Sequence, residues 1–432
     1  MEKSIYQLPF QVLGRIFFYN RSQRWNREKL AKYQDERLKL LIQYANRHVP
    51  YYRKLFKEIE LDAEKFKGIE DLSKIPLLDK ETVRTRKEEF LSDEARSGNI
   101  TWDSTSGSTG TPLHFALNNS VQANKIAALL RSFYWGGYRL RGRTLMVQSY
   151  YFNETDFQRN PLYNVIRFDS NRLSEASALR LAGEIIRKPV KTIIGFPFDI
   201  LWIARFAADA NRRIPSPHSI ITYGEKLSTE RRELLTAYYR CPVFDFHSMH
   251  ECSVMISQCE KGSLHLIEDF AYMEIVDEKG KATADKGMLV GTNYYNYMMP
   301  LIRYNTRDAV QPSKAECSCG RAFRVVQEIF GKECDAIRTP DGRILGAVMS
   351  HSVDRAKGVV MSQCVQDALD HLLVRIVVDS SYDSESQTAL EAGLRKRIGS
   401  EMKLDFEIVS QLEKTTGGKT PFIISKIARS DS

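Results

Sequence analysis

The stretch Ser104-Thr105-Ser106-Gly107-Ser108-Thr109-Gly110-Thr111-Pro112 says most about how this chain is built. Its two glycines lie among six hydroxyl side chains, and a proline ends the run. Glycine permits positive φ and a close approach of the backbone, and consecutive amide groups in such a turn bind anions. We therefore expect a loop that cradles a phosphate chain. A flexible Ser/Gly linker is the alternative, whereas a Walker-type loop would end in Gly-Lys-Ser/Thr.

Composition indicates a globular protein with two or more domains in its 432 residues. The net charge of +9 suits anionic partners, but no block of Lys and Arg dominates, so we expect no nucleic-acid groove. Seven unevenly spaced cysteines do not form a disulfide framework. The apolar stretch Pro9–Tyr19 predicts a helix that packs on the protein body, with peripheral membrane contact as the alternative. We expect a cytoplasmic protein.

Hydrophobic spacing predicts the layers of the fold. Residues 25–95 show helical spacing, broken at Pro50, with Asp79 as a helix N-cap. From 120 to 245, the strands 144–147, 192–194 and 219–222 are expected to alternate with the helices 201–208 and 229–239. The pattern then turns to β over 264–267, 272–276 and 288–293. A smaller α+β unit follows, with strands 371–379 and 404–409 around a helix over 388–398. The fold class is therefore α/β, with layered sheets and helices.

Two short pairs of soft ligands predict a metal site. Cys259 precedes His265 by six residues, and Cys317-Ser318-Cys319-Gly320 follows much later. Thiolates and an imidazole match Zn²⁺, and four protein ligands make a closed, structural site. The alternative is a set of unrelated buried cysteines.

Three further segments carry weaker signals. Asp245-Phe246-His247-Ser248-Met249-His250-Glu251 could bind metal or do acid–base chemistry, or could be a surface strand end. Asp308, in Leu301–Asp308, could accept hydrogen bonds from a ribose diol, or be a turn acid. Lys414-Thr415-Thr416-Gly417-Gly418-Lys419 places a cation on a glycine-rich tip, although most such lysines are solvated.

In this order, the segments resemble those of adenylate-forming enzymes of the phenylacetate–CoA ligase family, especially its capsule-biosynthesis-like branch. The resemblance covers nearly the whole chain and rests on Val49–Tyr52, Leu72–Leu77, Thr105–Pro112, Tyr223–Leu227, His247–Glu251, Pro300–Asp308, Gly331–Asp335 and Gly418-Lys419. The chain departs from the family pattern around the nucleotide. His247 replaces Tyr, Ser248 replaces Gly, His250 replaces a hydroxyl residue, Arg307 replaces Gly, and Lys332 replaces the hinge Arg.

The resemblance implies a large N-terminal adenylation domain, residues 1–332, and a small mobile C-terminal domain, residues 333–432. It implies that Lys419 and Glu251 are catalytic, Glu251 as a Mg²⁺ ligand, and that Cys259, His265, Cys317 and Cys319 bind zinc. The residues implied to contact ATP are Thr105, Ser106, Gly107, Ser108, Thr109, Gly110, Thr111, Gly224, Glu225, Asp245, Phe246, His247, His250, Asp308 and Lys332.

The implied reaction joins a carboxylic acid to ATP as acyl-AMP and then transfers the acyl group to coenzyme A. Transfer to an amine is the alternative acceptor step, and a homodimer is possible. Ser149–Phe152 and Gly195–Phe198 are expected to line the acid pocket, where aromatic side chains favour an apolar or aromatic acid. A non-catalytic scaffold and a basic nucleic-acid-binding protein are the alternatives from other classes.

Overall fold

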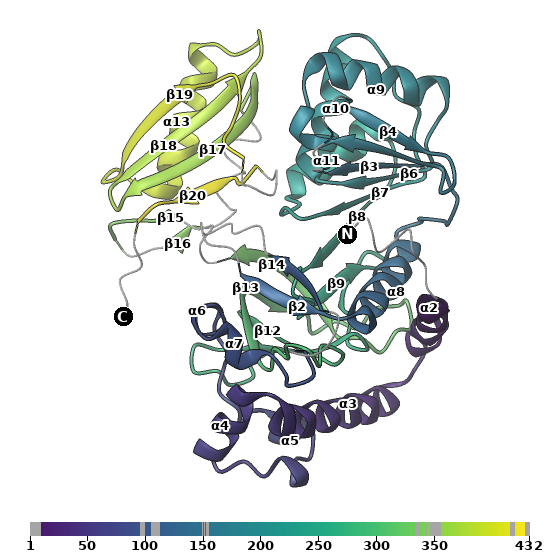
Figure 1. Cartoon of the computed structure of the whole chain (residues 1–432). Helices are drawn as coiled ribbons and strands as arrows, with labels where there is room; N and C mark the ends of the chain where they lie inside the picture. The colour runs from purple at the N-terminus through teal and green to yellow at the C-terminus, as the bar shows by residue number, and fades with distance from the viewer. Residues whose placement is uncertain are drawn as a thin grey trace. The chain divides into compact units, whose positions relative to one another are not determined.

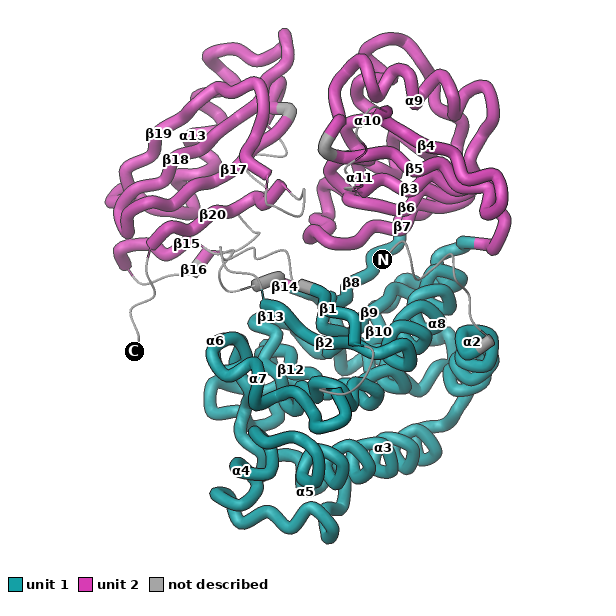
Figure 2. Tube along the Cα trace, viewed as in Figure 1, with its two compact units in different colours: residues 1–105, 110–138, 244–329 teal, residues 106–109, 139–243, 330–432 magenta. Residues whose placement is uncertain are grey.

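The computed structural model describes residues 10–95, 100–104, 113–148, 150, 152, 155–332, 337–341, 344–345, 356–414 and 420–427. It confirms the α/β fold class and divides into two compact units (Figure 2). Unit 1 contains the described residues of 1–105, 110–138 and 244–329. Unit 2 contains those of 139–243 and 330–432. No helix in these described ranges is both long and apolar enough to cross a bilayer.

Unit 1 begins with helices and continues with an antiparallel sheet (Figure 1). Its helices are α2 (Phe10–Ser22), α3 (Arg27–His48), α4 (Pro50–Glu58), the 3-10 turn η1 (Ala63–Lys65), α5 (Ile69–Leu72), α6 (Lys80–Thr85), α7 (Lys87–Phe90) and α8 (Asn119–Trp135). As predicted, the helical run breaks at Pro50, and the Asp79 side chain caps α6 by accepting from the Thr82 amide at 2.9 Å.

The strands of unit 1 pair mainly antiparallel. β1 (Thr101–Ser104) pairs with β2 (His114–Leu117). The larger sheet has the order β11-β12-β13-β14-β10-β9-β8 in this part of the chain. These strands are β8 (Val243–Ser248), β9 (Met255–Gln258), β10 (Leu264–Leu266), β11 (Ala271–Val276), β12 (Gly287–Asn293), β13 (Tyr304–Pro312) and β14 (Val325–Lys332). The β pattern expected over 264–293 is confirmed.

Unit 2 contains a parallel sheet with helices. The strands β3 (Thr144–Gln148), β4 (Phe157–Asn160), β5 (Val165–Asp169), β6 (Thr192–Gly195) and β7 (Ser219–Tyr223) have the order β7-β6-β3-β5-β4, and only β4 runs antiparallel to its neighbour. The 3-10 turn η2 (Ser170–Arg172) and the helices α9 (Glu175–Arg187), α10 (Pro197–Asp209) and α11 (Thr229–Tyr239) connect them. α11 has the bounds that the sequence predicts, because the Ser228 side chain caps it.

The C-terminal part of unit 2 is a four-stranded sheet with one helix. The order is β19-β18-β17-β20, formed by β17 (Val359–Ala368), β18 (His371–Val378), β19 (Lys403–Ile408) and β20 (Ile423–Ser425). The short strands β15 (Ile337–Arg338) and β16 (Ile344–Leu345) pair with each other. Helix α13 (Ser384–Ile398) shares a buried core with Val374 and Ile376 of β18. It begins four residues before the predicted start because Asp383 and Ser386 form a capping box.

Candidate functional site

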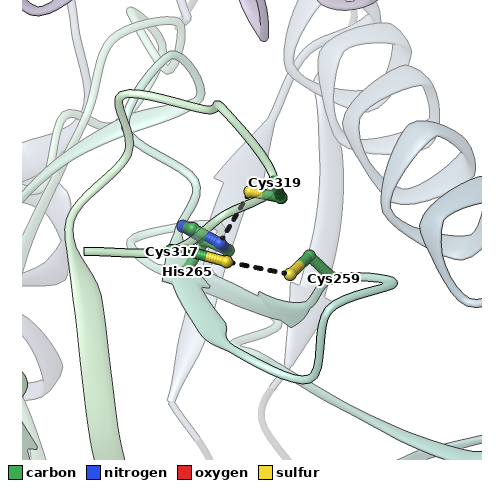
Figure 3. Close-up of side chains that lie close together, drawn as sticks. All are labelled: Cys259, His265, Cys317 and Cys319. Atoms are coloured by element: carbon green, nitrogen blue, oxygen red, sulfur yellow. Dashed lines mark hydrogen bonds between the residues drawn. The ribbon is translucent and has the colours of Figure 1, made fainter. Parts of the chain in front are cut away.

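The four predicted zinc ligands lie together in unit 1. Cys259 follows β9, His265 lies in β10, and Cys317 and Cys319 lie between β13 and β14. Their ligand atoms all lie within 4.8 Å of one another. The Cys259 and Cys317 sulfurs are 3.6 Å apart, and the Cys319 sulfur is 3.4 Å from His265 Nε2 (Figure 3). Three thiols and one imidazole that converge in this way could bind one zinc ion. All four tetrahedral positions would then be filled by protein ligands, as in structural zinc sites.

Neighbouring residues orient this cluster. The other ring nitrogen of His265, Nδ1, lies 3.1 Å from the Phe323 carbonyl, so donation to that carbonyl leaves Nε2 as the free ligand atom. Arg321, two residues after Cys319, stacks over Trp135 of α8 at 4.1 Å and donates two hydrogen bonds of 3.0 Å to Glu260. The cluster is thereby supported from α8 and from the β9–β10 turn.

Two of the predicted nucleotide residues form a pair in unit 1. His247 Nε2 of β8 lies 3.1 Å from Asp308 Oδ2 of β13. Asp308 is buried, whereas His247 is partly exposed. The Asp308 amide donates to Thr306 Oγ1 at 3.1 Å, which fixes the backbone beneath the carboxylate. A buried carboxylate with an imidazole on one oxygen can accept hydroxyl hydrogen bonds from a ligand.

Glu251 is buried in the turn after β8, and its flanking carbonyls are held from both sides. Lys125 Nζ of α8 donates to the His250 carbonyl at 3.1 Å, and Asn293 Nδ2 of β12 donates to the Cys252 carbonyl at 2.6 Å. Burial, together with the nearby Glu251 carboxylate, raises the pKa of the Tyr304 hydroxyl well above its ordinary value. The turn therefore presents Glu251 from a rigid support.

The other predicted residues of β8 and of the turn after it have separate surroundings. The Asp245 amide donates a hydrogen bond to Oε1 of the Gln258 side chain at 3.0 Å. The Phe246 ring packs edge-on against Phe133 of α8, with centroids 5.3 Å apart, and is part of the core. His250 is exposed.

The backbone at Arg307 has a φ of 63°, in the left-handed region. The family pattern has glycine here, the residue that adopts this conformation without steric cost. This chain therefore keeps the backbone turn before Asp308 while carrying an arginine. The Asn305 side chain supports the turn by accepting from the Arg307 amide at 2.9 Å.

The remaining predicted residues lie in unit 2 or outside the described residues. Gly224 and Glu225 follow β7, and Gly224 has a φ of 82°. Lys332 ends β14, although its side chain lies outside what the structure describes. Thr105, Ser106, Gly107, Ser108, Thr109, Gly110, Thr111 and Lys419 also lie outside the described residues.

Unit 2 holds a charged group that the sequence reasoning missed. Asp199, in the first turn of α10, is buried, and its Oδ2 has no hydrogen-bond partner among the described residues. Burial raises its pKa to about 6, against the opposing effect of the Lys414 ammonium. Lys414 Nζ donates to the Ser170 carbonyl at 2.7 Å. In the sequence, the only signal for Asp199 was its position as an acid in the first turn of a helix that follows a buried strand.

These groups lie where parallel strands end. β5 ends at Asp169, immediately before Ser170, and β6 ends four residues before Asp199. In open α/β sheets, ligands bind outside the carboxyl ends of the strands. Asp169 accepts from the amides of Tyr150 and Phe152 at 3.1 and 2.9 Å, so it positions part of the segment expected to line the acid pocket.

Comparison with known proteins finds similarity to two kinds of protein. Residues 337–426 match the family described as the CapK C-terminal domain. The chain is 21% identical over 440 residues to protein CapK of Staphylococcus aureus, covering 97% of this chain and 96% of that protein. It is 25% identical over 333 residues to phenylacetate-coenzyme A ligase of Thermus thermophilus, covering 72% of each.

The fold also matches a solved structure over nearly its whole length. A crystal structure of 2-hydroxyisobutyryl-CoA ligase, in the postadenylation state with 2-HIB-AMP, superposes with a TM-score of 0.75 at 18% identity, covering 94% of this chain and 92% of that one. The fold is that of the adenylate-forming ligases. By sequence, the chain is similar both to the phenylacetate–CoA ligases and to CapK.

We predict that the protein contains a single zinc ion per chain when purified without added metal. Cys317→Ser should lose the metal and lower the melting temperature, because three ligands cannot close the site. Metal analysis and thermal unfolding measure the two effects. Cys241→Ala, at a buried cysteine outside the cluster, should keep the zinc. Metal-free wild-type protein, or Cys317→Ser with unchanged zinc, would contradict the prediction.

We predict that Asp199→Asn stabilises the protein at neutral pH. The pKa of Asp199 is raised from 3.8 to about 6, so the unfolded chain releases this proton first, and the wild type loses stability as pH rises between those values. Denaturant titrations at several pH values should show the advantage of the variant appearing in that interval and persisting above it.

Glu184 provides the control of opposite sign for Asp199→Asn. Hydrogen bonds from Arg159 and Arg187 lower its pKa from 4.5 to about 2, against the effect of burial. Glu184→Gln should therefore be less stable than wild type at neutral pH, with a deficit that shrinks as the pH falls through that interval. If the stability difference between Asp199→Asn and the wild type does not change with pH, the prediction that the pKa of Asp199 is raised is wrong.

Proposed function

We propose that this chain activates a carboxylic acid with ATP and then transfers the acyl group to coenzyme A. The observation that carries the proposal is the match to an adenylate-forming fold over nearly the whole chain. The pair of Asp308 and His247 in unit 1 is consistent with it. The similar proteins, a phenylacetate-coenzyme A ligase and a 2-hydroxyisobutyryl-CoA ligase, suggest a carboxylic acid as substrate and coenzyme A as acceptor. The residues below are assigned on the family resemblance and on their placement.

In the first half-reaction, a carboxylate oxygen of the acid attacks the α-phosphorus of ATP. The bond from this phosphorus to the bridging oxygen breaks, pyrophosphate leaves, and acyl-AMP remains. Catalysis of such a step is mainly positioning and stabilisation of phosphate charge. We assign the phosphate cradle to Thr105–Thr111, the ribose contact to Asp308, and the adenine contact to Gly224 and Glu225.

Two charged residues complete this assignment. Glu251 would bind Mg²⁺, a hard cation that prefers carboxylate and phosphate oxygens and would neutralise the charge on the departing pyrophosphate. Lys419 would neutralise the charge that develops on the carboxylate and the α-phosphate. Lys414, five residues earlier, donates to the Ser170 carbonyl in unit 2 and would seat the segment that carries Lys419.

In the second half-reaction, the thiol sulfur of coenzyme A attacks the acyl carbonyl, the thiol proton is released and AMP leaves. We propose that residues 333–432 form the small domain that rotates between the two steps. A second candidate is transfer to an amine. Its support is that the C-terminal part matches CapK, whereas the phenylacetate ligases align over only 72% of this chain.

We predict that Asp308→Asn weakens ATP binding. Loss of a charged acceptor for the ribose hydroxyls costs about 1.5–3 kcal/mol, roughly tenfold or more in the dissociation constant. Glu251→Gln should instead slow acid-dependent pyrophosphate release and raise the Mg²⁺ requirement. Calorimetry and a pyrophosphate assay measure these effects, with Asp285→Asn, an exposed acid of unit 1, as the matched control. Wild-type behaviour of both site variants would refute the nucleotide assignment.

We predict that Lys419→Ala separates the half-reactions. Formation of acyl-AMP should slow by roughly 10²-fold, as when other electrostatic donors are removed. Transfer from synthetic acyl-AMP should continue near the wild-type rate, because the small domain then presents another face. Lys426→Ala, at an exposed lysine on the same part of the chain, should change neither step. Equal loss in both steps would assign Lys419 to folding or general binding, and no loss would make it a surface residue.

A further inference from the structure

Helix α2 lies against α8 (Figure 1), and its two faces differ in burial. Val12 packs with Ala123 and Ile126 of α8, and Tyr19 donates to Asn124 of the same helix at 3.1 Å. On the other side, Leu13 is 47% exposed and Phe17 is 75% exposed. The helix therefore packs on the protein body, as the sequence predicts, but leaves a leucine and a phenylalanine one turn apart in solvent.

Basic residues continue this exposed face. Arg21 follows Phe17 by four residues, which places both on one side of α2, and Arg24 lies in the turn after this helix. With Asn20, Trp25 and Lys29, they line an open depression of about 480 Å³. We call Leu13, Phe17, Arg21, Arg24 and Lys29 the α2 face.

Among the described residues, the cations of the α2 face have no acidic partners. In the described part of the chain, Arg21, Arg24 and Lys29 form no ion pair, and the depression has no Asp or Glu in its lining. Lys29 instead lies over the Trp25 ring, at 5.2 Å from its centroid. Nearby Arg27 shows the contrast, because it pairs with the buried Glu268 at 2.8 Å. Three cations without acidic partners among the described residues therefore lie beside the exposed Phe17 ring. This combination favours a partner that has anionic groups at its surface and an apolar interior.

We propose that the α2 face docks the protein peripherally on a bilayer that contains anionic lipid. Phe17 and Leu13 would enter the region between headgroups and acyl chains, while Arg21, Arg24 and Lys29 would contact lipid phosphates. A free anion would bind the cations but would leave Phe17 without a partner. A purely apolar protein partner would bury the three cations without counter-charges. The proposal does not depend on the acid or the acceptor of the reaction.

Vesicle binding by the whole protein tests the docking. Wild type should bind vesicles of phosphatidylglycerol and phosphatidylcholine, should bind phosphatidylcholine vesicles much less, and should lose binding at high salt. Arg21→Glu/Arg24→Glu should weaken binding by roughly a hundredfold or more, since each cation near an anionic surface contributes about fivefold. Phe17→Ser should weaken it by roughly tenfold.

Matched variants keep this test specific. Lys54→Glu/Lys57→Glu on α4 makes the same change in charge, and Ile408→Ser removes another exposed apolar side chain, 61% exposed. Both should bind vesicles nearly as wild type does, and all variants should melt as wild type does. Equal loss in the α4 control, or no wild-type binding to the anionic vesicles, would overturn the proposal. So would light scattering that shows a dimer lost in Phe17→Ser without any vesicle binding, because the face would then join two copies of the chain.

Discussion

The ion pair between buried Arg303 and partly buried Glu274 fixes the strand that carries the proposed ribose contact. The Arg303 guanidinium donates to both Glu274 oxygens at 3.0 and 2.9 Å, to the Ile75 carbonyl at 2.6 Å and to the Gly280 carbonyl at 2.9 Å. Its side chain is buried, and removing one partner of such a pair typically costs about 3–5 kcal/mol. One residue thereby ties the N-terminal helical segment, β11 and the start of β13 together.

The backbone around Arg303 serves the same purpose. Arg303 has a φ of 52°, and the chain on either side pairs with Leu78, whose amide donates to the Arg303 carbonyl and whose carbonyl accepts from the Asn305 amide, both at 2.9 Å. A second left-handed residue, Arg307, precedes Asp308. Left-handed positions of this kind persist only where neighbouring groups hold them, as Leu78 holds Arg303 and the Asn305 side chain holds Arg307.

Local signals explain what the sequence could predict. The cap at Asp79, the break at Pro50 and the helix 229–239 depend on residues within one or two turns, and each is found. The four soft ligands could also be predicted, because paired cysteine and histidine residues at short spacing are typical of zinc sites, and the structure brings them together. The hydrogen bond of Arg303 to Ile75 and the charge of Lys414 near Asp199 join residues more than a hundred positions apart, so no local pattern could reveal them. The predicted roles of the loop Thr105–Thr111 and of Lys419 remain predictions.

The chemistry proposed here has one defining event, the attack of a carboxylate oxygen on the α-phosphorus of ATP. An acid labelled with heavy oxygen in its carboxylate, turned over with ATP and coenzyme A, follows that oxygen directly. The account predicts that a labelled oxygen appears in the phosphate of AMP, since the bond from the acyl carbon to that oxygen breaks in the second step. Label in the pyrophosphate or in free phosphate, with none in AMP, would contradict it.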